Sequence, residues 1–193
     1  MFFTGDFFSD SALMTEYLDE IPLYTGTERN GQKFFNRPKG KAKPESTKYG
    51  CTWRKRLTDT TERTWDEGVG LYRTKIMDDY PHLNDLFREY SEHHFPYFIW
   101  TQVQINLLPE GTSIKCHLDK KNVGDSMLVA FGDFTGGSAY VICNDEEKHL
   151  TDPTNSPQKF NGAKIRHGVE EVLTGTRYSL VFYNDILKRM NRY

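Results

Sequence analysis

The pattern of apolar and polar residues changes near residue 96. Before that point, an apolar stripe at helical spacing predicts an amphipathic helix over residues 80–94. The stripe consists of Leu83, Leu86, Phe87 and Tyr90. A shorter helix is expected over residues 9–20, and a turn-rich segment follows it. The first half of the chain is therefore expected to be mixed and partly helical.

After residue 96 the pattern becomes that of short strands. Runs rich in β-branched and aromatic residues alternate with turns in which glycine supplies a positive φ, as at Gly162 and Gly175. The predicted strands cover residues 97–108, 114–119, 126–134, 138–143, 163–169 and 177–184. Helices followed by many short strands predict an α+β fold with a mainly β core, a double-sheet jelly roll with N-terminal helices packed on one face.

The length of 193 residues fits one domain. We divide it into a mixed region over residues 1–95, a jelly-roll core over 96–185 and a short tail over 186–193. The sequence has no signal-peptide pattern and no apolar stretch of membrane length, so a soluble, intracellular protein without a membrane partner is expected. Three cysteines at unrelated spacings do not predict a disulfide framework.

Basic residues are concentrated in one segment, although the net charge of the chain is only −2. Residues 33–56 hold nine lysines and arginines and one acid, Glu45. Two prolines and a glycine between residues 37 and 45 predict an exposed loop, and we assign a basic loop to residues 33–56. Four basic residues of this loop are candidate substrate contacts: Arg37, Lys39, Lys41 and Lys43.

A candidate metal site begins at His117 and Asp119. Residues two apart in a strand project to the same face, so this imidazole and this carboxylate can bind one ion. His167, in a later predicted strand, is the third candidate ligand. Two histidines and one carboxylate leave coordination positions free, as the iron(II) centres of oxygen-activating enzymes require.

A candidate anion site follows on the next predicted strand. Arg177 and Ser179 share a face, so a guanidinium and a hydroxyl can grip one carboxylate. A dicarboxylate whose other end chelates the metal would join the two sites, and 2-oxoglutarate has that shape. Each motif by itself also occurs as a surface pair or a salt bridge, so the prediction depends on their order and strand context together.

Two alternatives use the same residues differently. A cupin-like protein would keep the metal site without turnover, although it would not need the carboxylate grip at Arg177 and Ser179. Zinc in the same three-residue site would act on water instead of dioxygen. Metal analysis separates zinc from iron.

These residues also carry a family resemblance. The stretch from Gln104 to Phe134, with residues 160–162 and 175–182, resembles the iron(II)/2-oxoglutarate dioxygenase superfamily. It is most similar to the branch that contains the ten-eleven-translocation and base-J-binding-protein oxygenases and their viral, phage and algal relatives. The resemblance covers residues 100–183, and the residues before that lie outside it.

The resemblance implies a double-stranded β-helix that binds iron(II) through His117, Asp119 and His167 and 2-oxoglutarate through Arg177. Asn106 lies where related enzymes place a further polar contact to the co-substrate. The implied activity is hydroxylation of a C–H bond with dioxygen, and no catalytic residue beyond the metal ligands is nominated.

The implied substrate is a methylated base in DNA or RNA, and the aromatic residues within the basic segment suit that partner. The alternative is hydroxylation of an amino acid, a peptide side chain or a small metabolite. A solvated lysine-rich loop and a pI near 6.3 favour that alternative. The sequence does not indicate an oligomeric state.

Overall fold

In the part of the chain that the structure describes, two antiparallel sheets and three helices make up the fold. The larger sheet contains β2 (Glu45–Trp53), β3 (Leu71–Arg73), β4 (Gln102–Pro109), β6 (Val123–Phe131), β7 (Phe134–Gly136), β10 (Gln158–Phe160) and β12 (Val172–Asn184). The smaller sheet contains β1 (Phe35–Asn36), β5 (Ser113–His117), β8 (Ala139–Cys143), β9 (Glu146–His149) and β11 (Arg166–Val169). The helices are α1 (Phe7–Asp19), α2 (Lys75–Asp79) and α3 (Leu83–His94).

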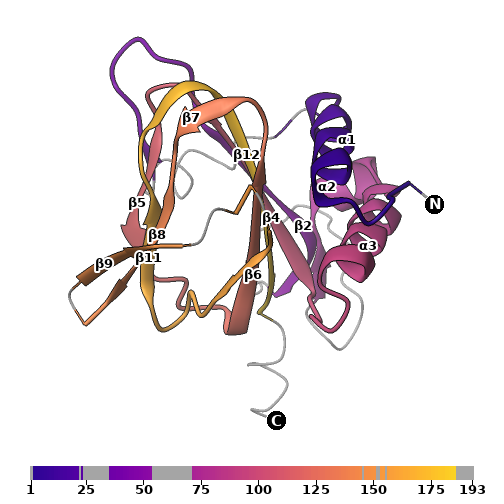
Figure 1. Cartoon of the computed structure of the whole chain (residues 1–193). Coiled ribbons are helices and arrows are strands. Elements are labelled where there is room, and N and C mark those ends of the chain that lie inside the picture. Colours follow the sequence, from indigo (N-terminus) through magenta and orange to yellow (C-terminus); the bar gives the residue numbers. More distant parts are fainter. Residues whose placement is uncertain are drawn as a thin grey trace, which may run out of the picture.

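The strand order is that of a double-stranded β-helix. The computed structural model describes residues 2–21, 23, 35–53, 71–144, 146–150, 153–154 and 156–185. The larger sheet has the order β10-β6-β12-β4-β2-β3, and β7 pairs with the first part of β12. The smaller sheet has the order β1-β5-β11-β8-β9 and faces the larger one (Figure 1). The predicted jelly roll with a mainly β core is confirmed.

The helices cover the outer face of the larger sheet (Figure 1). All four residues of the predicted α3 stripe are buried. Within that stripe, Phe87 packs edge-on against Tyr49 of β2 and Phe182 of β12, with ring centroids 5.3 and 6.1 Å away. Burying a side chain of this size stabilises the fold by about 1.5–3 kcal/mol. The periodicity of the sequence therefore predicts both α3 and the face that it buries.

Strand β12 separates the two layers of the core. Tyr178, Leu180 and Phe182 belong to the cluster that contains the helices. Val181 instead packs in a second cluster with Leu128 of β6 and others from the smaller sheet, between the two sheets. Because side chains alternate along a strand, Arg177, Ser179 and Tyr183 share this inner face with Val181.

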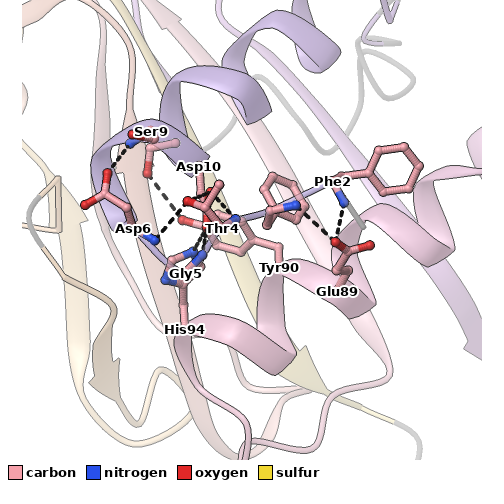
Figure 2. Close-up of polar contacts among 11 residues, drawn as sticks. Phe2, Thr4, Gly5, Asp6, Ser9, Asp10, Glu89, Tyr90 and His94 are labelled. Carbon is pink, nitrogen blue, oxygen red and sulfur yellow. Dashed lines mark hydrogen bonds and ion pairs between the residues drawn. The ribbon is translucent and has the colours of Figure 1, made fainter.

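The N-terminal segment is fixed to α3 by the buried carboxylate of Asp10 (Figure 2). Asp10 accepts hydrogen bonds from the backbone of Thr4 and Gly5, both 2.8 Å long, and lies 2.9 Å from Nε2 of His94. Asp6 caps α1 by accepting a 2.8 Å bond from the backbone of Ser9. Burial lowers the pKa of His94, so its contact with Asp10 is a hydrogen bond from a neutral imidazole. Leaving a buried partner of such a bond unsatisfied typically costs about 1–3 kcal/mol.

One prediction about the N-terminal half is wrong. Residues 45–53 were expected within a basic loop, but they form strand β2 beside β4. The alternation of this segment explains the strand, because Tyr49 is buried against α3 while Lys48 projects to the other face. The nine basic residues of the wider segment 33–56 obscured that alternation. Residues 33, 34 and 54–56 of the predicted loop lie outside the described residues.

Smaller differences concern strand bounds and membrane contact. β4 begins at Gln102 instead of residue 97, because residues 95–98 form a turn in which the backbone of Phe98 bonds to Phe95. β12 begins at Val172 instead of residue 177, because its first part pairs with β7. In the described part of the chain, every helix is too short or too polar to cross a bilayer.

Candidate metal centre

Two adjacent strands of the smaller sheet bring the predicted histidines together. His117 ends β5, and His167 of β11 is its direct partner across the strand pair. Paired residues of an antiparallel ladder project to the same face. The two imidazole centroids are 4.4 Å apart, and the rings are inclined by 50°. Fifty residues of intervening chain are thus bridged by one strand pairing.

The turn after β5 adds the carboxylate. The backbone N–H of Asp119 donates a 2.8 Å hydrogen bond to Gly162, and its carbonyl accepts one of 2.8 Å from Asn122. Its Oδ1 lies 3.7 Å from Nε2 of His117, and its Oδ2 lies 3.4 Å from Nε2 of His167. We call these three residues, His117, Asp119 and His167, the triad.

The spacing of the triad suits a single ion. One possible ligand atom from each residue lies within 4.8 Å of the others. Nitrogen and oxygen ligands about 2.0–2.2 Å from a common ion would be roughly 3–4 Å apart. A small contraction therefore brings all three atoms into one coordination sphere. Two imidazoles and a carboxylate are a donor set that fits ferrous iron or a similar divalent transition ion.

Backbone carbonyls orient both imidazoles. Nδ1 of His117 lies 2.7 Å from the carbonyl of Lys115, and Nδ1 of His167 lies 3.0 Å from that of Ile165. A proton on Nδ1 donates to each carbonyl, which leaves the lone pair of Nε2 directed at the triad centre. Outer hydrogen bonds of this kind fix the tautomer of metal-bound histidines.

The electrostatics of the triad favour ligation near neutral pH. Burial lowers the pKa of His117, and the neighbouring charge of His167 lowers it further. Burial alone would raise the pKa of Asp119, but the hydrogen bond from His167 and the charges of both histidines and Lys48 lower it overall. A neutral imidazole and a carboxylate are the protonation states that bind a metal.

Gly162 closes against the triad, a role that the sequence did not reveal. A Cβ at this position would lie 3.1 Å from Cε1 of His167, 3.2 Å from the ring of Phe160 and 3.3 Å from Oδ2 of Asp119. The sequence predicted residues 161–162 as a turn with a positive φ at Gly162, but the φ of Gly162 lies outside that region, so the prediction of a positive φ is wrong. A side chain at 162 would push on two of the three ligands, so only glycine fits without displacement.

The predicted co-substrate residues lie on the inner face of the larger sheet. Arg177 is fully buried, and its Cζ lies 5.8 Å from the centroid of the Phe134 ring. Ser179 is also buried, and its Oγ accepts a 3.3 Å hydrogen bond from the amide of Asn106. Ser46 of β2 donates a 2.8 Å bond to the other end of that amide. The structure therefore places Arg177, Ser179 and Asn106 on one face.

The predicted substrate contacts lie elsewhere. Arg37, Lys39, Lys41 and Lys43 are exposed in the segment that connects β1 to β2. Lys41 forms a 2.6 Å ion pair with Glu110, in the turn between β4 and β5. β5 begins at that turn and ends at His117. These basic residues thus lie at one end of the barrel and the triad at the other.

We name the two ends of the barrel accordingly. The loop end is formed by residues 37–44 and the β4–β5 turn, and it lies at the top of Figure 1. The triad end is formed by the end of β5, the start of β4 and the end of β12. A hollow beside the smaller sheet holds no triad residue and is lined by Asn36, Ser113, Ile114, Lys115, Cys116, Tyr140, Val169, Glu170 and Glu171.

Solved structures share the fold of the chain. No family model and no curated protein matches the sequence. A prolyl hydroxylase from Trichoplax adhaerens, in complex with a peptide of hypoxia-inducible factor, is 13% identical with a TM-score of 0.54 over all of this chain and 84% of that one. At that identity the likeness shows the double-stranded β-helix and nothing further.

Two structures of lower similarity complete the comparison. NgTET1 in complex with DNA containing 5-methylcytosine is 16% identical with a TM-score of 0.49, over 72% of this chain and 60% of that one. An oxidoreductase of the 2OG-Fe(II) oxygenase family from Burkholderia pseudomallei is 20% identical with a TM-score of 0.43, over 58% of this chain. The chain covers 57% of that protein.

Proposed function

We propose that this protein is a 2-oxoglutarate-dependent iron(II) oxygenase that hydroxylates a C–H bond of its substrate. The observation that carries the proposal is the convergence of His117, Asp119 and His167, whose ligand atoms lie within 4.8 Å of one another. The three residues come from two strands and one turn, and each histidine is already oriented by a backbone carbonyl. This is a donor set with coordination positions left free.

The residues of the chain hold and orient the reactants. Iron with 2-oxoglutarate and dioxygen would supply the oxidation, in which the keto acid becomes succinate and carbon dioxide and the substrate R–H becomes R–OH. His117, Asp119 and His167 would hold the ion. The Nδ1 hydrogen bonds of the histidines keep Nε2 free for it. The chain itself supplies no general base to this scheme.

Arg177 would hold the far carboxylate of 2-oxoglutarate. Its planar guanidinium matches a carboxylate in two parallel hydrogen bonds, and burial between the sheets keeps water from competing. Ser179 and Asn106, which are hydrogen-bonded to each other on the same face, would complete the polar lining. This arrangement favours an oxygenase over a cupin-like binding protein, which has no need of a dicarboxylate site.

For the substrate, we retain the proposal made from the sequence, a methylated base in DNA or RNA. Its alternative is an amino acid, a peptide side chain or another small molecule. The salt dependence of substrate binding separates them, because phosphate contacts release counterions and make affinity fall steeply with salt. A shallow dependence would favour the small molecule.

The test of the proposed function compares two aspartates. Iron(II) and 2-oxoglutarate, added without oxygen, should give a weak visible charge-transfer band, and oxygen should then release succinate. Asp119→Asn should abolish both signals, whereas Asp125→Asn, at an exposed position on β6, should keep them. Failure of the wild-type protein to bind 2-oxoglutarate in calorimetry would disprove the proposal. Tight binding of zinc with no response to iron would favour the zinc alternative.

A further inference from the structure

Lys48 lies on the inner face of the larger sheet. It pairs with Gln104 of β4, and Gln104 pairs with Val181 of β12, which packs between the sheets. Two residues earlier on β2, Ser46 accepts a 2.6 Å hydrogen bond from the amide of Gln104. Tyr49 packs against α3 on the opposite face. Because side chains alternate along a strand, Lys48 projects to the side that also carries Arg177 and Ser179.

The ammonium of Lys48 lies at the triad end. Its Nζ is 5.3 Å from the centroid of the Tyr183 ring, near the end of β12. The hydroxyl of Tyr183 donates a 2.5 Å hydrogen bond to Gln102 at the start of β4. Burial raises the pKa of Tyr183, and the charges of Asp185 and Asp119 raise it further. Asn184 of β12 pairs with Val123 at the start of β6, directly after the Asp119–Asn122 turn, so Tyr183 and Lys48 lie at the same end of the barrel as the triad.

The ammonium of Lys48 has no ion-pair partner among the described residues. No carboxylate of these residues lies within 4.0 Å of Nζ, and the ammonium contacts the Tyr183 ring. Burial lowers the pKa of Lys48, although Asp185 and Asp119 oppose that shift, and Lys121 adds to it. The side chain nevertheless keeps an exposed surface, so a ligand can reach it. An ammonium in this setting gains most from an anion that arrives with a ligand.

We propose that Lys48 binds an anionic group of the substrate, a carboxylate or a phosphate, and thereby holds the neighbouring C–H bond at the metal centre. The inference rests on the proposed function and adds the chemical class of the substrate to it. The ring of Tyr183 stabilises the ammonium through a cation–π contact and restricts the positions that the Lys48 side chain can adopt. The role of Lys48 is to contact the substrate, since its ammonium lies beyond 4.0 Å from the carboxylate of Asp119.

The test uses pairs of probes that differ by one charge. L-amino acids are compared with their amides, and nucleoside 5′-monophosphates with the free nucleosides. Each probe is measured for binding by calorimetry and for stimulation of succinate release by the iron-loaded protein. The variants are Lys48→Gln, Lys48→Arg and Lys159→Gln. Lys159 lies on β10 and is exposed, so its variant is the matched control.

The wild-type protein should prefer the charged member of at least one pair. The preferred pair then identifies the anion as a carboxylate or a phosphate. Lys48→Gln should weaken binding of that probe about 10-fold or more, the loss expected for a charge-assisted hydrogen bond. Lys48→Arg should recover part of the loss, and Lys159→Gln should match the wild-type protein. Lys48→Gln should leave the affinities for iron and 2-oxoglutarate within about twofold, because the residue contacts neither site.

Three results would overturn the inference. They are equal binding of charged and neutral probes by the wild-type protein, an unchanged preference in Lys48→Gln, and a loss in Lys48→Gln that falls on iron affinity instead. Failure of the proposed function has a different signature, namely no binding of 2-oxoglutarate and no succinate from any variant. The calorimetric comparison of charged and neutral probes still decides the role of Lys48 in that case.

Discussion

The two ends of the barrel both carry basic side chains, but the surroundings of those side chains differ. At the loop end, Arg37, Lys39 and Lys43 are exposed, and Lys41 pairs with Glu110 in an ion pair open to water on both sides. On the inner face, Arg177 is fully buried, and Lys48 is held against an aromatic ring near the triad. Exposed pairs contribute little because water and salt screen them.

This contrast teaches how charge should be weighed in a sequence. The basic segment stands out because it holds nine basic residues against one acid, but a count does not say which of them lies near the metal site. Lys48 belongs to strand β2 and projects to its inner face, whereas Lys43 lies in the loop before that strand. A cation held beside a metal site can discriminate between ligands, whereas one in an outer loop mainly raises the local potential.

The largest effect is expected at the triad. His167→Ala should remove iron binding almost completely and lower affinity by more than about 100-fold, beyond the roughly 10–100-fold typical of an outer-shell change. His149→Ala, at an exposed position on β9, should bind iron as the wild-type protein does. Calorimetry under anaerobic conditions measures both. Equal iron affinity in the two variants would place the metal elsewhere.

The next effect is expected at Arg177. Arg177→Lys keeps the charge but loses the two-pronged geometry, so the dissociation constant for 2-oxoglutarate should rise by about 10- to 100-fold. Arg166→Lys makes the same change at an exposed position on β11 and should have no such effect. Iron affinity should stay unchanged in both. A normal affinity for 2-oxoglutarate in Arg177→Lys would exclude Arg177 as its anchor.

A smaller effect is expected from Gly162→Ala. The added methyl group would press on His167, Phe160 and Asp119 at 3.1–3.3 Å, so it should displace two ligands by a few tenths of an ångström. We expect iron affinity to fall by roughly tenfold, as for a loss of ligand orientation. The φ of Gly162 lies outside the left-handed region, so thermal stability should change little. A large loss of stability with normal iron affinity would contradict this explanation.

The smallest effect is expected at the loop end. Lys41→Gln breaks an exposed ion pair far from the triad, so succinate release with a small substrate should stay within about twofold of wild type. The same variant tests the sequence-based prediction that this loop contacts substrate. If binding of an oligonucleotide becomes less salt-dependent in Lys41→Gln, the loop contacts phosphate after all. The substrate would then contact both the loop end and the triad end of the barrel.

Several elements could be predicted because their signals are local. The stripe on α3 follows helical periodicity, and the strands of the second half follow β-branched and aromatic runs bounded by glycine. The short strands β1, β3, β9 and β10 could not be predicted, because two to four residues carry no readable period. Strand β2 was missed for a different reason. Its inward positions hold serine and lysine instead of apolar residues, so the segment lacks the apolar alternation that predicts a strand.

The candidate site also has features that the sequence predicts and features that only the tertiary structure decides. The order of His117, Asp119, His167, Arg177 and Ser179 along the chain is a property of the sequence, and strand alternation already indicates which of them share a face. Their convergence is decided by the pairing of β11 with β5 and of β12 with β4, over separations of dozens of residues. The packing of Gly162 against two ligands has no local signal at all.

The sequence by itself determined the longer strands of the second half, the mainly β fold class and the identity of the residues in the triad. Those properties depend on the period of apolar residues and on residue chemistry, both of which can be read within a short window. The tertiary structure alone decided which basic residue lies at the triad end of the barrel and which ones lie at the loop end. That outcome depends on pairing between distant strands, because the environment of a charge is set by neighbours that are remote in the chain.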